Sequence, residues 1–318
     1  MSIIQSVINR LPGEQMGYVD GVNRYLRDRP NLIALLQLSL GLFLVFVVLG
    51  VSLLIVVFYS FVRPVPPESL TDVSVTLEHY QLGFVETTFY LRVMWDSFVI
   101  AVQTTILCIL LAYPAAYFIA FSDLEYKNIW LLLIIIPFWI NLVIRTYAWM
   151  LILGNRGLIN WLLIDLAGFV QDPIPLLFSQ GAIVVGLTHV FLPFILIPIF
   201  TSLDRIDRSH VEAAKNLGAN KLQAFYEVTL PQSLPGVAAG VMIVFVLSFG
   251  SFLTPILLGG AENIMIANLV EEMFGQINNW GLGSALAVVF VIVVLAIVYT
   301  FNRLIGLKEL YSQEGEAQ

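Results

Sequence analysis

The stretch from Ile183 to Ser202, IVVGLTHVFLPFILIPIFTS, decides the fold class of this chain. It contains no Asp, Glu, Lys or Arg, and its length is about the 20 apolar residues that a helix needs to cross the hydrocarbon core of a bilayer. The apolar residues form a solid run and do not alternate with polar ones, so a spanning helix is favoured over a β-barrel strand. Pro193 and Pro198 are compatible with such a helix, because neighbouring groups in a membrane bundle can satisfy the freed carbonyls.

Five further apolar segments flank this stretch. We expect spanning helices over residues 32–61, 97–121, 129–153, 235–258 and 283–304 as well. The whole chain is 59% hydrophobic and only 12% charged, against roughly 25% charged residues in a typical soluble domain. The sequence therefore predicts an all-α membrane protein with six transmembrane helices.

The basic residues predict how the chain is oriented. Eleven of the 15 Lys and Arg residues fall on the segments that are inside if the N-terminus is cytoplasmic, three fall outside, and Arg145 lies within the third span. We therefore expect a cytoplasmic N-terminal segment 1–31, a six-span domain 32–304 and a cytoplasmic tail 305–318. The first apolar run is too long for a cleaved signal, which favours an uncleaved first span. The prediction is a multi-pass protein of the inner (plasma) membrane.

Several kinds of chemistry lack the residues they would need. The chain has one cysteine, Cys108, and its three histidines are far apart in sequence, so neither a disulfide within the chain nor a metal site is expected. No GxxxxGK phosphate loop is present. We therefore expect no catalytic residue, no cofactor and no nucleic-acid partner.

The longest inside loop, residues 203–234, reads LDRIDRSHVEAAKNLGANKLQAFYEVTLPQSL. Ser209 with Glu212 three residues later forms a capping-box pattern for a short helix. Gly218 is suited to end that helix as a C′ glycine. A second short helix is expected over residues 221–227. The loop is thus predicted to be a bent pair of short helices on the cytoplasmic surface.

This loop resembles the EAA loop of importer-type ABC permeases. The family pattern is EAA-x3-G-x9-I-x-LP, and this chain has Val228 in place of the isoleucine. The matching residues are Glu212, Ala213, Ala214, Gly218, Leu230 and Pro231. The resemblance implies that these residues belong to a coupling helix that docks into a groove on an ATPase subunit.

Residues 95–304 resemble the permease core more widely, and the similarity is to the spermidine/putrescine-type permeases. It is carried by residues 96–97, 104–105 and 113–117, by IRTYAW at 144–149, and by LLGG at 257–260. The resemblance implies the type I importer (MetI-like) fold and transport of polyamines by alternating access. The implied partners are two ATPase subunits that bind the ATP, a second homologous permease and an external binding protein.

This chain departs from the polyamine-type pattern at one place, so other small solutes also stay open as substrates. Relatives often carry an acid near the end of span five, where this chain has Ser248, Ser251 and Thr254. Glu262, Glu271 and Glu272, between spans five and six, are candidates to meet a cation or a binding protein at the external mouth.

Arg145 is the base that we place within a span, where a charge is costly and has to face the bundle interior or water. Three roles stay open: an ion pair with Asp96, a place in the pathway or gate, and contact with the external binding protein. The other pathway or gate candidates are Asn141, Tyr147, Trp149 and Trp139, whose aromatic faces could attract a cation. His189 is expected to be a packed, hydrogen-bonded residue.

Two rival functions remain at this point. An ion-gradient-driven secondary transporter would need acids within the spans, which are absent from the predicted segments, and would leave the EAA pattern unexplained. A non-transporting membrane scaffold or sensor would also have no need for that pattern.

Overall fold

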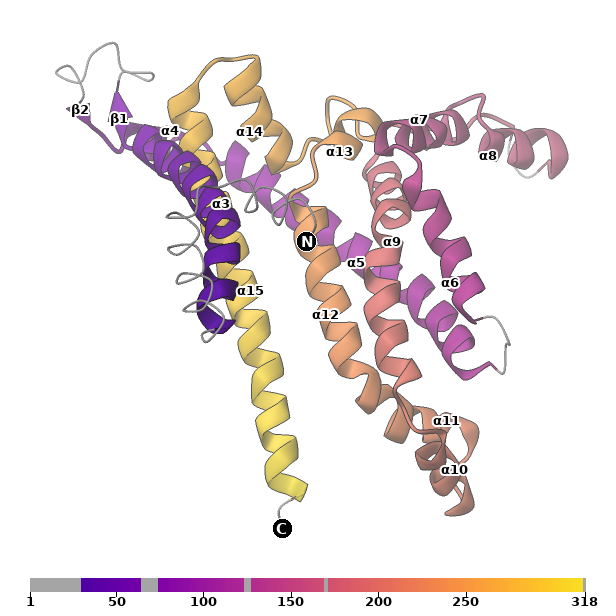
Figure 1. Ribbon diagram of the computed structural model, residues 1–318. Coiled ribbons are helices and arrows are strands. Elements are labelled where there is room, and N and C mark those ends of the chain that lie inside the picture. The colour runs from indigo at the N-terminus through magenta and orange to yellow at the C-terminus, as the bar shows by residue number, and fades with distance from the viewer. Residues whose placement is uncertain (1–29, 64–73, 123–126, 169–170, 317–318) are drawn as a thin grey trace, which may run out of the picture. The chain divides into compact units, whose positions relative to one another are not determined.

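The long apolar runs form helices because a backbone surrounded by hydrocarbon has to satisfy its own hydrogen bonds. The computed structural model describes residues 30–63, 74–122, 127–168 and 171–316, and these are mostly helical (Figure 1). The backbone divides into two units, Met1–Phe58 and Tyr59–Gln318. The first unit holds nearly all of α3 (Pro30–Ser60), which has no charged residue.

The second unit begins with an antiparallel hairpin of β1 (Val62–Arg63) and β2 (Ser74–Val75). Its helices in chain order are α4 (Glu78–Phe84), α5 (Phe89–Phe121), α6 (Lys127–Ile135), α7 (Leu142–Leu153), α8 (Leu158–Trp161), α9 (Gln180–Asp204), α10 (Arg208–Asn216), α11 (Lys221–Ala224), α12 (Leu230–Phe249), α13 (Leu253–Leu258), α14 (Ile266–Gly275) and α15 (Trp280–Glu316). A 3₁₀ turn, Ile136–Trp139, separates α6 from α7, and π-helical turns cover Leu162–Leu166 and Phe225–Thr229.

Five helical segments of the described residues are long and apolar enough to cross a membrane. They lie in α3, α5, α9, the continuous run from α11 through α12, and α15. A sixth crossing would be the bent pair Ile129–Trp139 and Leu142–Leu166, whose two parts meet at 89°. The predicted all-α membrane fold is confirmed, but the expectation of one helix over residues 129–153 is wrong.

The break in this span follows from two residues. Pro137 has no N–H to donate to the preceding turn, and the chain tightens there into the 3₁₀ turn. Asn141 then caps a new helix, because its side-chain Oδ1 accepts the N–H of Val143 at 2.8 Å. The second half of the predicted span therefore leaves in a new direction as α7.

Other boundaries shift as well. α5 begins at Phe89, before the predicted start at residue 97. The fifth span ends at Phe249, where Gly250 is the C-cap, and the rest of the predicted segment forms the separate helix α13. α15 continues to Glu316, past the predicted boundary at residue 304.

The core of the second unit is built around α9, which packs against both α5 and α12. The face of α5 that meets it carries small residues about four positions apart, and small residues let helix backbones approach closely in a membrane. They are Cys108, Ala112, Ala116 and Ala120. This packing fixes the position of the chain that leaves α9 toward α10.

α9 and α12 also approach closely, because α12 presents two glycines four residues apart. A Cβ atom on Gly236 would lie 2.5 Å from the carbonyl oxygen of Pro198, and one on Gly240 would lie 3.0 Å from Cα of Ile195. The stretch GVAAG, residues 236–240, thus acts as a small-xxx-small contact between two spans.

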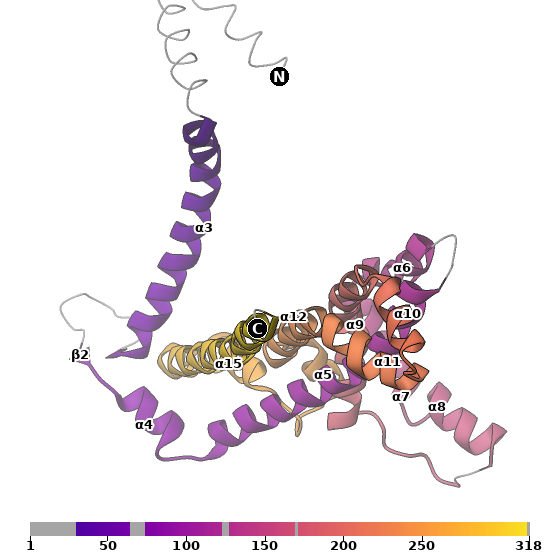
Figure 2. The same ribbon diagram turned by 90° about the horizontal axis from the view of Figure 1, so that it is seen from below.

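The elements of the second unit gather at two ends. α10, α11 and the C-terminal end of α15 lie at one end, named the α10 end here (Figure 1). α4, α7, α8, α13 and α14 lie at the other, the α14 end. Seen from below, α10 and α11 lie beside the ends of α9 and α12 (Figure 2).

Candidate functional site

The α10–α11 unit, residues 207–229, begins with a helix cap that differs from the predicted one. Asp207, not Ser209, is the N-cap of α10, and its Oδ1 accepts the backbone N–H of Ser209 at 2.9 Å. This backbone bond, with a further bond from the Ser209 side chain, lowers the pKa of Asp207. A depressed carboxyl pKa means that the cap is formed at neutral pH and is lost only as the pH falls through that lowered value.

Gly218 ends α10 as predicted. Its φ of 97° is in the region that favours glycine. The N–H of Gly218 donates to the carbonyl of Lys215, and the N–H of Ala219 donates to that of Ala214, each at 3.0 Å. These two bonds form a Schellman motif, which satisfies carbonyls that the helix end leaves without partners. The turn between the two short helices is therefore set by backbone chemistry.

The second half of the unit is not a separate short helix. Asn220 and Gln223 form a reciprocal capping box at the start of α11. The helix then passes through the π-helical turn Phe225–Thr229 into α12, so the expectation of a second short helix that ends at residue 227 is wrong. Pro231 lies in the first turn of α12, where a missing N–H is tolerated. α11 is therefore continuous with a membrane-spanning helix.

Phe225 anchors this unit on α5. Its ring makes edge-to-face contacts with Tyr113 and Tyr117, with ring centroids 5.8 Å and 5.7 Å apart. The hydroxyl of Tyr113 is also 2.9 Å from Oγ of Ser233 on α12. Sequence reasoning missed Phe225, since an aromatic residue in a loop does not indicate which helix it contacts.

The opposite face of the unit is open to solvent. Glu212, Ala213, Gly218 and Pro231 are exposed, and Ala214 and Leu230 are half-buried. Leu217 is 91% exposed beside Gly218. A groove of ≈ 360 Å³ lies between the two short helices, lined by Ala214, Leu217, Gly218, Ala219, Gln223 and Glu227. The unit thus offers a mixed apolar and acidic surface at the α10 end.

Arg145 lies on α7 and is buried, with 8% of its surface exposed. Its guanidinium Cζ is 5.0 Å from the ring centroid of Phe138, on the other side of the break. Within the described residues it forms no ion pair, and its buried Nε has no hydrogen-bond partner. Asp96 lines a different cavity, so the structure does not join these two residues.

The other pathway candidates on the broken span have different surroundings. Nε1 of Trp149 donates to Nδ1 of His189 on α9 at 3.1 Å, which confirms His189 as a packed, hydrogen-bonded residue. Asn141 is used as the cap of α7. Trp139 and Tyr147 are 81% and 51% exposed. The five predicted pathway residues therefore do not line one common cavity within this chain.

Substituting Arg145 by alanine is expected to reduce thermal stability, because the cation–π contact across the break is lost. The expected loss is about 1–2 kcal/mol, the range for a desolvated contact of this kind. Arg145→Met keeps the packing of the side-chain stem and should lose less. Melting followed by size-exclusion chromatography in detergent measures both, and an unchanged melting temperature for the alanine variant would contradict the structural role.

A polar cavity of ≈ 570 Å³ opens at the α14 end between α5, the start of α9 and the loop before α14. Arg92, Asp96, Gln180, Glu262 and Asn263 contribute its polar lining. Of the predicted mouth residues, Glu262 lines this cavity, whereas Glu271 and Glu272 lie on α14 outside its lining. Two carboxylates against one guanidinium give the cavity a net negative charge, which attracts cations.

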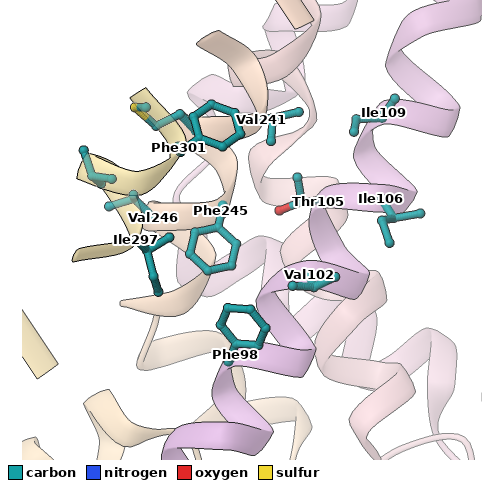
Figure 3. Close-up of a pocket in the computed structure, with 12 residues that line it drawn as sticks. Phe98, Val102, Thr105, Ile106, Ile109, Val241, Phe245, Val246, Ile297 and Phe301 are labelled. Carbon is teal, nitrogen blue, oxygen red and sulfur yellow. The ribbon is translucent and has the colours of Figure 1, made fainter. Parts of the chain in front are cut away.

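A second cavity, of ≈ 300 Å³, lies between α5, α12 and α15 (Figure 3). Its lining is apolar except for Thr105, whose hydroxyl already donates to the carbonyl of Ala101 at 2.7 Å. Phe98 and Phe245 lie side by side in its wall and contact each other edge to face, with ring centroids 5.6 Å apart (Figure 3). Nothing in this cavity could replace the water around a charged or polar solute, so it suits an apolar neighbour and not a hydrophilic substrate.

Known proteins with similar sequences indicate the family to which this chain belongs. Residues 83–307 match the family described as binding-protein-dependent transport system inner membrane component. The spermidine/putrescine transport system permease protein PotB of Haemophilus influenzae is 33% identical over 229 residues, 72% of this chain and 79% of that protein. PotB of Escherichia coli K12 is 34% identical over 222 residues, 69% of this chain and 80% of that protein.

A solved structure shares the fold. It is a bacterial ABC transporter involved in the import of the acidic polysaccharide alginate, with a TM-score of 0.66 and 18% identity, covering 89% of this chain and 97% of that one. The family match spans well over half of the chain and includes the α10–α11 unit. The chain therefore belongs to the family of inner-membrane components of binding-protein-dependent transport systems, and it is a multi-pass permease subunit of such an importer.

Proposed function

We propose that the α10–α11 unit is the surface on which an ATPase subunit docks, and that it passes ATP-driven movement into the membrane helices. The observation that carries this proposal is the unit's two-sided construction. One face presents Glu212, Ala213 and Leu217 to solvent, and the other is fixed to α5 by Phe225. Continuity of α11 with α12 supplies a direct mechanical path.

The assembly that follows contains two ATPase subunits, a second homologous permease and an external binding protein. ATP is bound by the ATPase subunits, and this chain carries out no covalent step. The α10 end then faces the cytoplasm, with both termini inside. The bases gathered there support this orientation. They are Lys127, Arg205, Arg208, Lys215 and Lys221.

The proposed substrate class is a polyamine such as spermidine or putrescine, moved by alternating access. Two PotB proteins named for these substrates are 33% and 34% identical to this chain. The acidic cavity with Asp96 and Glu262 gives a cation a favourable approach at the α14 end. The missing acid near the end of span five counts against polyamines only in part, because Ser248 and Thr254 are buried whereas Ser251, between α12 and α13, is partly exposed.

The experiment that tests this function expresses the chain with its ATPase, second permease and binding protein and follows uptake of labelled putrescine. We expect ATP-dependent uptake in the wild type. Glu212→Lys should reduce co-purification of the ATPase at least about tenfold, because a reversed charge at a docking surface costs more than the lost attraction.

Glu271→Lys is the matched control, since it reverses an exposed acid on α14 at the other end of the molecule. It should leave ATPase retention unchanged. Equal retention in the Glu212→Lys variant would remove the docking assignment, and uptake of another solute but of neither polyamine would remove the substrate assignment.

A further inference from the structure

Lys127 and Asp204 each lie where the dipole of their own helix disfavours their charge. Lys127 is the first residue of α6, where an acid is preferred, and Asp204 is the last residue of α9, where a base is preferred. Nevertheless Nζ of Lys127 is 3.0 Å from Oδ1 of Asp204, across 77 positions of sequence. Each charge therefore has its favourable partner on the other helix.

The same lysine also holds the end of α5. Its Nζ donates to the carbonyl oxygen of Ala120 at 2.7 Å, in the last turn of α5, where helix carbonyls attract cations. Arg208, the first residue of α10, adds a long bond of 3.5 Å from Nη2 to the carbonyl of Ser122. The ends of α5, α6 and α9 are thus joined at the point where the chain enters the α10–α11 unit.

Stability alone does not account for this arrangement. The side chains of Lys127 and Asp204 are 28% and 44% exposed, and ion pairs at such positions contribute little to folding. Each charge is at the helix end that its own helix dipole disfavours, and the pair adds little stability. The pair is therefore better explained by its effect of joining α6 to α9.

We propose that Lys127 and Asp204 form a clasp that makes the broken span α6–α7 follow α9 and α10 when the docked ATPase moves. This inference rests on the proposed function of the α10–α11 unit. At the break between α6 and α7, Phe138 makes an edge-to-face contact with Phe194 of α9, with ring centroids 5.1 Å apart, and on α7 the Nε1 of Trp149 donates to Nδ1 of His189. Because α6–α7 is held to α9 at the start of α6, at the break and on α7, loss of the clasp frees the start of α6 alone.

The test measures substrate transported per ATP hydrolysed by the whole complex in proteoliposomes. Lys127→Met and Asp204→Asn should each lower this ratio about fivefold to tenfold. The doubly substituted protein should be no worse than Lys127→Met alone, because loss of the lysine already removes its contact with Asp204 as well as its bond to the carbonyl of Ala120. The charge-swapped pair, Lys127→Asp with Asp204→Lys, rebuilds the attraction and should recover most of the ratio.

Arg303→Met is the matched control, because it removes one exposed base from the C-terminal half of α15 and so has the same effect on the charge bias that sets topology. It should transport as the wild type does. A ratio within twofold of wild type in both single variants, additive losses in the double variant, or no recovery in the swapped pair would each overturn the clasp. In those cases the ATPase stays bound, whereas failure of the wild type to retain an ATPase would contradict the proposed function itself.

Discussion

Replacing Gly236 by leucine is expected to prevent α12 from packing on α9 and to leave little folded permease. Even a Cβ atom at this position would lie 2.5 Å from the carbonyl oxygen of Pro198 and 2.5 Å from Cβ of Ser202. The carbonyl belongs to helix backbone and cannot rotate away. Overpacking by a methyl group costs about 1–3 kcal/mol, and leucine adds further carbons in the same direction. Heating followed by size-exclusion chromatography in detergent measures the loss.

Alanine at the same position and leucine on another face separate this contact from a general effect of bulk. Gly236→Ala should fall between wild type and Gly236→Leu, because it adds the colliding atom alone. Ala239→Leu adds the same kind of side chain to an exposed position of α12 and should melt near the wild type. A Gly236→Leu protein as stable as wild type would show that α9 and α12 do not approach as closely as the structure describes.

The sequence predicts the C-terminal end of α10 correctly but assigns its N-cap to the wrong residue. Gly218 ends α10 as predicted, because glycine pays no steric cost at positive φ. The N-cap is Asp207 and not Ser209, although Ser209 and Glu212 have capping-box spacing. Both Asp207 and Ser209 are good caps, and the sequence pattern does not say which residue leaves the helix first.

The broken third span shows that proline alone does not locate a break. Pro114 in α5 and Pro193 in α9 lie inside unbroken helices. At Pro137 the break is completed by Asn141, four residues later, which caps a new helix, but Pro198 has Ser202 at the same spacing and α9 continues to Asp204. The combination of a proline with a following cap residue was present in the sequence, and so was the GVAAG stretch of α12.

No local sequence pattern predicts the contacts between segments that are distant in the chain. Lys127 meets Asp204, and Phe225 meets Tyr113, only because α5, α6, α9 and α12 pack as they do. For the same reason the EAA resemblance could identify the coupling candidates but not the residues that fix them to the bundle. A single chain likewise does not bring Trp139 and Tyr147 into one pathway, because both are exposed on its surface.

Replacing Gly218 by valine is expected to uncouple ATP hydrolysis from transport. A β-branched residue at a φ of 97° carries backbone strain of at least about 1–2 kcal/mol. The strain is relieved if the turn opens and the two Schellman bonds at Lys215 and Ala214 are lost. The exposed face of α10 would then no longer be held at a fixed angle to α11 and α12. We expect uptake to fall about tenfold or more while the complex still hydrolyses ATP.

Asparagine at position 218 distinguishes backbone strain from added bulk at the docking surface. It is similar in size to valine but tolerates positive φ far better. No atom lies within 4 Å of a Cβ built on Gly218, so neither side chain collides with the rest of the chain. If the bend is what matters, Gly218→Asn keeps much of the uptake that Gly218→Val loses. Equal losses in the two variants would instead indicate that the ATPase subunit needs the space above this glycine, and the bend would not be the coupling element.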